Sequence, residues 1–422
     1  MTAPRLICGS AGALALGSLA VTLWTGVDER GVALAFGLLI AVGELTRPQA
    51  RNSVRAIGTS MTGARAREAA PIGAAGALSY ALLGEVAGRP AQHGAAQVVT
   101  VVLAASLLGS VPHIWQGRGP TLDHLARRVL TVGFAAVCFQ PLYSRGVFET
   151  LDGPAYALLV LTLLVLTELC DAVLAAVLAH SRTRWPFGPL LRDELRGLLG
   201  IGSAVCATGA VMALAVAVAG LWALPVFCLP LLLTQLSLRR YAAVRATYRQ
   251  TIASLARSTE VAGYTPAGHA RRVATLSLAV GRDLGLSGAE LTVLEYAALM
   301  HDIGQLSLVD PVPAGATAGL PPAEQQRIAL LGGAVVRQTG VDAAVAVVVE
   351  RQADPYREQP LAARIVRAVN AYEEKARDAG PGGPLTALEE LRLGTAGNYA
   401  PEVVESLARV LSRDCLTLPL PG

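Results

Sequence analysis

The sequence predicts an all-α protein in two parts, a polytopic transmembrane helical bundle followed by a second helical domain outside the membrane. Three observations support this prediction. First, hydrophobic residues make up 53% of the 422 residues and charged residues only 16%, which is more apolar than a typical soluble domain. Second, apolar runs of bilayer-spanning length recur through residues 1–237. Third, charged residues become frequent after residue 259, and apolar residues there recur at helical spacing without the alternation that strands show.

Eight apolar runs are candidate spans, judged against the roughly 20 residues that a helix needs to cross a bilayer. The second and third are short or rich in Gly and Ala, and the third contains Glu85, so the sequence supports six to eight spans and we predict about eight helices in the transmembrane region, residues 1–237. The runs are 6–25, 31–46, 71–88, 95–115, 127–143, 154–178, 196–217 and 219–237.

The distribution of arginine predicts the orientation in the membrane. With an even number of spans and a cytoplasmic C-terminus, the outer loops hold only Arg30, Arg89 and Arg145. Because positively charged loops stay on the cytoplasmic side, we expect both termini in the cytoplasm and a bacterial-type inner (cytoplasmic) membrane location. The formal charge of +4 is modest, and Arg residues beside apolar runs do not indicate nucleic-acid binding. The fifteen Arg residues of the inner segments are Arg5, Arg47, Arg51, Arg55, Arg65, Arg67, Arg118, Arg127, Arg128, Arg182, Arg184, Arg192, Arg196, Arg239 and Arg240.

Glu168 and Asp171 lie one helical turn apart inside the sixth apolar run. An ionisable pair within a membrane span is energetically costly, and by default it indicates a ligand or proton site. The alternative is that both carboxylates lie near the inner end of the span and meet Arg residues of neighbouring loops. For Glu44, which lies nearer a membrane interface, this second interpretation is favoured more strongly.

Residues 238–258 are predicted to form a helical stalk. Apolar residues fall three or four positions apart along it, which is typical of an amphipathic helix and also suits a two-helix coiled coil. One interpretation is a homodimer formed through the stalk, and the other is a helix that packs only on its own domain. The apolar positions are Leu238, Tyr241, Val244, Tyr248, Ile252 and Leu255.

Residues 259–414 are predicted to form a bundle of six or seven helices, with 415–422 as a tail. Ser287 followed by Glu290 predicts a capping box at the start of the second helix. Gly- and Pro-rich segments separate the helices. The predicted helices are 269–284, 288–301, 321–338, 341–352, 360–377, 384–393 and 401–412.

Two histidines occur in this domain, His269 at the start of one predicted helix and His301 at the end of the next, followed directly by Asp302. The surrounding segments resemble the HD superfamily of metal-dependent phosphohydrolases, and most closely the HD-GYP branch associated with cyclic di-GMP hydrolysis. The resemblance covers about residues 250–412 and implies an HD-type helical domain. The segments that carry it are Tyr264–His269, His301–Gln305 leading to Asp310, Pro360–Ile365 and Tyr399–Glu405.

The resemblance also implies a metal site, because phosphodiester hydrolysis needs an activated water and neutralised phosphoryl oxygens, which two clustered ions supply. His269, His301 and Asp302 match metal ligands of the family. The remaining positions depart from the pattern. Ile328 or Ala329 stands in place of one His, Glu350 and Arg351 replace a His pair, and the Gly-Tyr-Pro loop is shortened to 353–356. Asn370 replaces the late Asp, and Gln305 replaces a Lys that follows the HD pair.

The remaining donors suffice for one ion at most, with Glu350 or Asn370 as a fourth ligand. We therefore expect one divalent transition metal, Mn or Fe, or none. Arg351 is expected beside Asp302, where a guanidinium would supply the charge that a metal otherwise provides. Arg351 and Gln305 are the candidate phosphate-binding residues.

We favour a membrane-anchored signalling protein whose degenerate HD-GYP-like domain is a pseudoenzyme that binds or regulates rather than hydrolyses. An active phosphohydrolase or phosphodiesterase acting on a cyclic dinucleotide or another phosphate ester is the alternative, so the sequence leaves open whether the protein is an enzyme. His269 and His301 are also open to interpretation as ordinary buried histidines. The expected partners are the lipid bilayer, a cyclic dinucleotide or other nucleotide, and a second copy of the chain.

Overall fold

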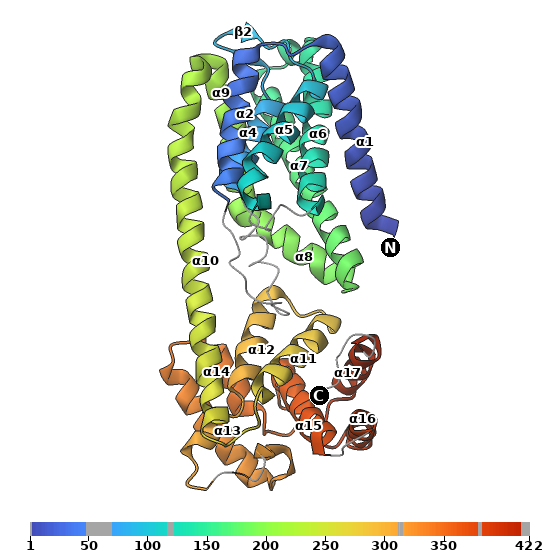
Figure 1. Cartoon of the computed structure of the whole chain (residues 1–422), viewed down its shortest axis with the longest axis vertical. Helices are drawn as coiled ribbons and strands as arrows, with labels where there is room; N and C mark the ends of the chain where they lie inside the picture. Colours follow the sequence, from blue (N-terminus) through green and yellow to red (C-terminus); the bar gives the residue numbers. More distant parts are fainter. Residues whose placement is uncertain are drawn as a thin grey trace. The chain divides into compact units, whose positions relative to one another are not determined.

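Figure 1 shows a computed structural model of the chain, which describes residues 2–47, 70–115, 122–310, 312, 315–378 and 382–414. The chain divides into two compact units, one of Met1–Asn52 with Met61–Ala242 and one of Ser53–Ser60 with Ala243–Gly422. The described residues are helical almost throughout, and the one sheet among them is a hairpin of β1 (Glu85–Val86) and β2 (Arg89–Pro90). The predicted all-α class is confirmed. The predicted tail 415–422 and Arg51, Arg55, Arg65, Arg67 and Arg118 lie outside the described residues.

Among the described residues, five segments are long and apolar enough to cross a membrane, and these indicate a membrane protein. The last of them includes two of the predicted spans, which are separated by a break at Gly220–Trp222 where Gly220 has a φ of 66°. The five segments are Ala3–Thr25, Ala95–Trp115, Leu122–Ser144, Gly153–Thr183 and Ser203–Val261. The helices are α1 (Thr2–Thr25), α2 (Arg30–Leu45), α4 (Pro71–Ala81), α5 (Ala95–Trp115), α6 (Leu122–Ser144), α7 (Gly153–Thr183), α8 (Phe187–Gly197), α9 (Ser203–Ala219) and α10 (Ala223–Val261).

The predicted span at 71–88 is wrong in its second half. Helix α4 has 11 residues, about 16 Å at 1.5 Å per residue, against a hydrocarbon core of about 30 Å. The chain then turns into the β1–β2 hairpin, because Ala87 and Gly88 have φ values of 52° and 73°, as a tight hairpin turn requires. Helix α2, with 16 residues, is also shorter than the roughly 20 residues of a full span.

The acidic residues of the first unit have partners on neighbouring helices. Arg127 donates two hydrogen bonds to the Asp171 carboxylate, at 3.2 and 2.7 Å. The Cys206 thiol donates to Glu168 at 2.6 Å. Arg128 donates to the buried Glu44 at 2.8 Å. Asp171 and Glu44 therefore have the arginine partners that the second interpretation expects, whereas Glu168 accepts a hydrogen bond from a thiol.

The predicted stalk is part of α10, which Figure 1 shows as one long helix. It ends at Val261, just before Gly263, whose φ is 80°. Its apolar stripe divides into two parts. Ile252 is buried and packs in the core of the second unit, whereas Tyr241 and Val244 are 57% and 66% exposed. Residues near Ile252 therefore pack on their own domain, whereas Tyr241 and Val244, nearer the first unit, are exposed.

The second unit is the predicted helical domain, and every helix boundary lies within two residues of its prediction. The capping box is present: the Ser287 N–H donates to Glu290 at 2.8 Å, and the Glu290 N–H donates back to the Ser287 hydroxyl. The helices are α11 (His269–Asp283), α12 (Gly288–Met300), α13 (Pro322–Gln338), α14 (Ala343–Arg351), α15 (Leu361–Asp378), α16 (Gly383–Leu393) and α17 (Pro401–Asp414).

Helix α15 lies in the core of this unit. Its buried face includes Ile365, Val366 and Val369, which pack with Val273 of α11 and Leu294 of α12 in one continuous apolar cluster. Because α11 and α12 both pack on α15, the start of α11 and the end of α12 are brought to the same region of that helix.

Candidate functional site

His269, His301 and Asp302 meet in the second unit. The His269 Nε2 lies 3.3 Å from Asp302 Oδ2, and the His301 Nε2 lies 3.1 Å from the same oxygen. The three residues are 1%, 1% and 4% exposed. One ligand atom from each lies within 4.8 Å of the others, which is the spacing of a group able to hold a metal ion.

Local structure fixes these positions. His269 is the first residue of α11, after Gly268 with a φ of 74°. His301 follows the last residue of α12, and Asp302 precedes the 3-10 helix η4 (Ile303–Ser307). Within η4, a Cβ at Gly304 would lie 2.0 Å from the Ile328 carbonyl oxygen. A glycine is therefore required for η4 to pack against α13, and this packing holds Asp302 in place.

Each imidazole is oriented by a partner on its other nitrogen. The His269 Nδ1 hydrogen bonds the Glu373 carboxylate of α15, which also accepts from Arg272 Nε at 2.6 Å. The His301 Nδ1 donates to the Ala298 carbonyl oxygen at 2.9 Å. Metal-binding histidines usually have such outer partners, which leave Nε2 available as the ligand.

The donor set fits a divalent transition metal. Both Nε2 atoms and the Asp302 Oδ2 are buried and make no aligned hydrogen bond within the described part of the chain. Imidazole nitrogen and carboxylate oxygen are ligands that Mn, Fe and Zn accept. Three buried donors that face one another at this spacing are therefore able to hold a cation.

The pKa shifts of the three residues show how strongly their charges interact. Burial alone would lower the pKa of His269, but the carboxylates of Asp302 and Glu373 outweigh burial and raise that pKa to about 10. The pKa of His301 is also raised, with burial opposed by Asp302. Burial likewise opposes ionisation of Asp302, yet the two imidazoles hold its pKa well below the usual range. The site therefore demands positive charge, which either protons or a metal ion provide.

Of the two candidate fourth ligands, Asn370 lies at the site and Glu350 does not. The Glu350 carboxylate is bound by the Arg337 guanidinium. Asn370 lines the same cavity as His301 and Asp302. Its Nδ2 donates to Glu374 at 2.8 Å, whereas its buried Oδ1 has no hydrogen bond within the described residues. Asn370 thus offers one neutral oxygen to an ion.

The expected pairing of Arg351 with Asp302 is replaced by local contacts. Arg351 Nε donates to the Asp354 carboxylate at 3.0 Å, and its Nη2 donates to the Glu358 carbonyl oxygen. A partner three residues away is reached at a smaller entropy cost than one on another helix. Gln305 is fully buried, and its side-chain amide makes no hydrogen bond within the described residues. Neither residue lines the cavity beside the histidines.

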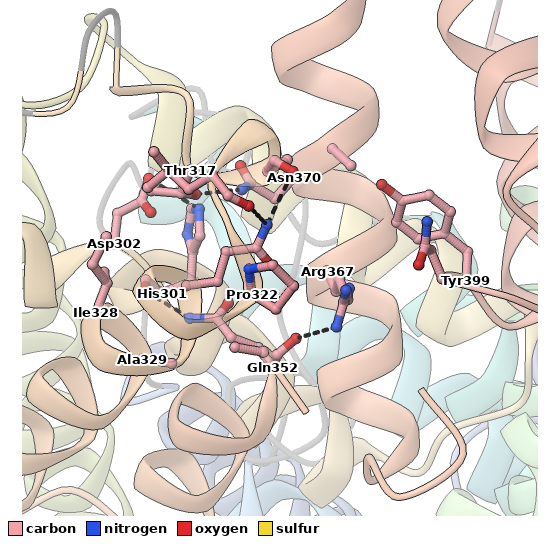
Figure 2. A pocket seen from close by; sticks show the side chains of 16 residues that line it. His301, Asp302, Thr317, Pro322, Ile328, Ala329, Gln352, Arg367, Asn370 and Tyr399 are labelled. Carbon is pink, nitrogen blue, oxygen red and sulfur yellow. Dashed lines mark hydrogen bonds and ion pairs between the residues drawn. The ribbon is translucent and has the colours of Figure 1, made fainter. Parts of the chain in front are cut away.

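A cavity of about 220 Å³ adjoins His301 and Asp302. Figure 2 shows these two residues on one side of it and Arg367 and Tyr399 on the other. Thr317 and Ala318 of the 3-10 helix η6 (Thr317–Gly319) form part of its wall, and their N–H groups donate to the Glu374 carboxylate at 3.1 and 3.0 Å. The remaining lining residues are Leu320, Pro322, Gln325, Ile328, Ala329, Gln352, Ala353, Asn370, Ala371 and Asn398.

Sequence reasoning missed Glu373, Glu374 and Arg367. All three lie on α15 within about one turn of Asn370, three or four residues away, and residues at this spacing share a helix face. That spacing was the available signal, because it groups polar residues around a position already singled out. Comparison of the chain with protein-family models, curated proteins and solved structures gave no match.

Proposed function

We propose that this membrane protein presents an HD-like helical domain that holds one divalent transition metal and binds a phosphate-bearing ligand beside it, as a signalling module rather than a rapid hydrolase. The observation that supports the proposal is that His269, His301 and Asp302 lie close together in the protein interior. The Nδ1 of each imidazole also makes a hydrogen bond that orients the ring. The resemblance of the surrounding segments to HD-type phosphohydrolases agrees with this chemistry.

One ion suits the described donors better than two. A two-ion site needs a bridging carboxylate and enough further ligands to complete both coordination shells. Asp302 is available to bridge, but Glu350 is engaged by Arg337, and Asn370 brings a neutral oxygen. Two dications that share only the Asp302 carboxylate as a common ligand would repel each other strongly in a buried site.

Within a mononuclear site, His269, His301 and Asp302 would bind the ion, and Glu373 would hold the His269 ring in place. A bound ion would polarise a phosphoryl oxygen and so orient a phosphate ligand in the cavity. Among the described residues that line the cavity, the imidazole and the carboxylate belong to His301 and Asp302, and both would bind the ion. This favours binding over turnover.

A one-metal phosphohydrolase is the second candidate, and the adjoining cavity favours it, since a substrate placed there would reach the ion. A hydrolysis assay distinguishes the phosphohydrolase from the binding module. Full-length protein in detergent, loaded with Mn²⁺, is mixed with bis(p-nitrophenyl) phosphate and, separately, with cyclic di-GMP. A His301→Ala, Asp302→Ala double variant serves as the control. The proposal expects no hydrolysis above that of the control, and hydrolysis that the double substitution removes would favour the enzyme.

A further inference from the structure

We propose that the Arg367 guanidinium anchors the anionic group of a small phosphate monoester in the cavity beside His301 and Asp302. This inference rests on the proposed function and goes beyond it, because it names the recognition residue and restricts the ligand to a size below that of a dinucleotide. Arg367 lines the cavity, and Figure 2 shows it across the cavity from Asp302.

Arg367 differs from the arginines around it in its partners. Its Nη1 donates to the carbonyl oxygens of Asp354 at 2.7 Å and Gln352 at 3.5 Å. No carboxylate lies within ion-pair distance of it in the described part of the chain. Several arginines of the same domain pair with carboxylates instead: Arg337 with Glu350, Arg351 with Asp354, Arg364 with Glu402 and Arg377 with Asp378.

A partly buried cation without a directly paired carboxylate is unfavourable: burial lowers the pKa of Arg367, and the nearby Asp354 carboxylate, which is paired with Arg351, opposes this only in part. A guanidinium has five N–H donors, and carbonyl oxygens bring no negative charge to balance it. An oxyanion in the cavity would accept from the remaining donors and neutralise the charge. Arg is suited to this because its planar fork matches phosphate geometry.

Arg367 and the metal site lie on the same cavity. Arg367 and Asn370 are three residues apart on α15, about 4.5 Å along the helix axis, and so share a face. Asn370 in turn lines the cavity with Asp302. A phosphate group bound in this cavity would therefore lie between two cations, Arg367 and an ion that His269, His301 and Asp302 would hold.

The size and lining of the cavity restrict the rest of the ligand. Its volume of about 220 Å³ is below the roughly 300–1,000 Å³ of sites that enclose drug-sized molecules. A phosphate with a small organic group fits within that volume, whereas a cyclic dinucleotide would extend beyond it. Leu320, Pro322 and Ile328 offer apolar contact to the organic part, and Asn398 offers a neutral hydrogen-bonding amide.

The test measures binding of phenyl phosphate, inorganic phosphate and cyclic di-GMP to the full-length protein in detergent by isothermal titration calorimetry, with Mn²⁺ content determined on the same samples. Arg367→Gln is the test variant. Arg351→Gln is the matched control, since Arg351 lies nearby but outside the cavity lining. We expect phenyl phosphate to bind best, Arg367→Gln to weaken it by about 10- to 100-fold through loss of charged hydrogen bonds, and Arg351→Gln to leave it unchanged.

The inference is overturned if Arg367→Gln binds phenyl phosphate as tightly as the wild type, or if Arg367→Gln and Arg351→Gln lose the same affinity. It is also overturned if cyclic di-GMP binds more tightly than phenyl phosphate, or if no probe binds at millimolar concentration. Unchanged Mn²⁺ content in Arg367→Gln shows that the domain is folded. Mn²⁺ bound normally without an effect of Arg367 on anions rejects the inference alone. Anion binding that depends on Arg367 in a protein that holds no Mn²⁺ rejects the proposed metal site and keeps the inference.

Discussion

Glu373→Gln tests how the proposed metal site is organised. The Glu373 side chain is 11% exposed and contacts both His269 Nδ1 and Arg272. Glutamine keeps the size of the side chain but removes the charge that makes the imidazole a stronger ligand and fixes its orientation. Loss of such an outer partner typically costs about 10- to 100-fold in metal affinity, which corresponds to about 1.4–2.8 kcal/mol.

The assay is a Mn²⁺ titration of full-length protein against a competing chelator near neutral pH. Glu350→Gln is the control, because it removes a carboxylate of the same domain that is bound to Arg337 and not to the site. We expect the loss of affinity in Glu373→Gln and none in Glu350→Gln. A change below about threefold, under 1 kcal/mol, or an equal loss in both variants would refute the role assigned to Glu373.

Three further predictions concern pH, the membrane unit and the stalk. The pKa of His269 is raised to about 10, from about 6.5 in the unfolded chain, so the folded metal-free protein binds more protons between these two pH values. Its thermal stability should therefore fall as the pH rises from about 6.5 to about 10. His269→Gln should reduce this pH dependence of the melting temperature. Asp171→Asn removes the charge that Arg127 pairs with, and the two side chains are only 20% and 19% exposed. This substitution should lower the free energy of unfolding by about 1–3 kcal/mol, measured as a lower melting temperature. Asp123→Asn is the control, because its partner Arg182 is 58% exposed, and it should lower that free energy by at most about 1 kcal/mol. If the stalk forms a homodimer, Val244→Cys in a background without the native cysteines should form disulfide-linked dimers in membranes. Ala246→Cys, about 200° around the helix, should not. Equal crosslinking at both positions would contradict a dimer formed through the stalk.

The helices of the second unit could be predicted because their signals are local. Apolar residues recur at helical spacing, Ser287 and Glu290 form the capping box, and Gly263 and Gly285, both with positive φ, follow helix ends. Composition alone was less informative in the membrane unit. The run at 71–88 is apolar enough for a span, but the turn at Ala87 and Gly88 ends it in a hairpin.

The site was predictable only in part, because its outer contacts depend on tertiary packing. His269, His301 and Asp302 were predicted from motifs near helix ends, and the structure brings them together. Glu373 is 104 residues from His269 in sequence, and only the packing of α11 on α15 reveals its role. Arg351 was expected at Asp302 because it stands where the family resemblance places a metal-binding His, but Arg351 instead pairs with Asp354, one turn away.

Metal content of the purified full-length protein tests the mononuclear site most directly. After loading with Mn²⁺ and removal of unbound metal, elemental analysis by mass spectrometry should find one ion per chain in the wild type and almost none in Asp302→Asn. Two ions per chain, or equal metal in wild type and variant, would contradict a single cation held by His269, His301 and Asp302.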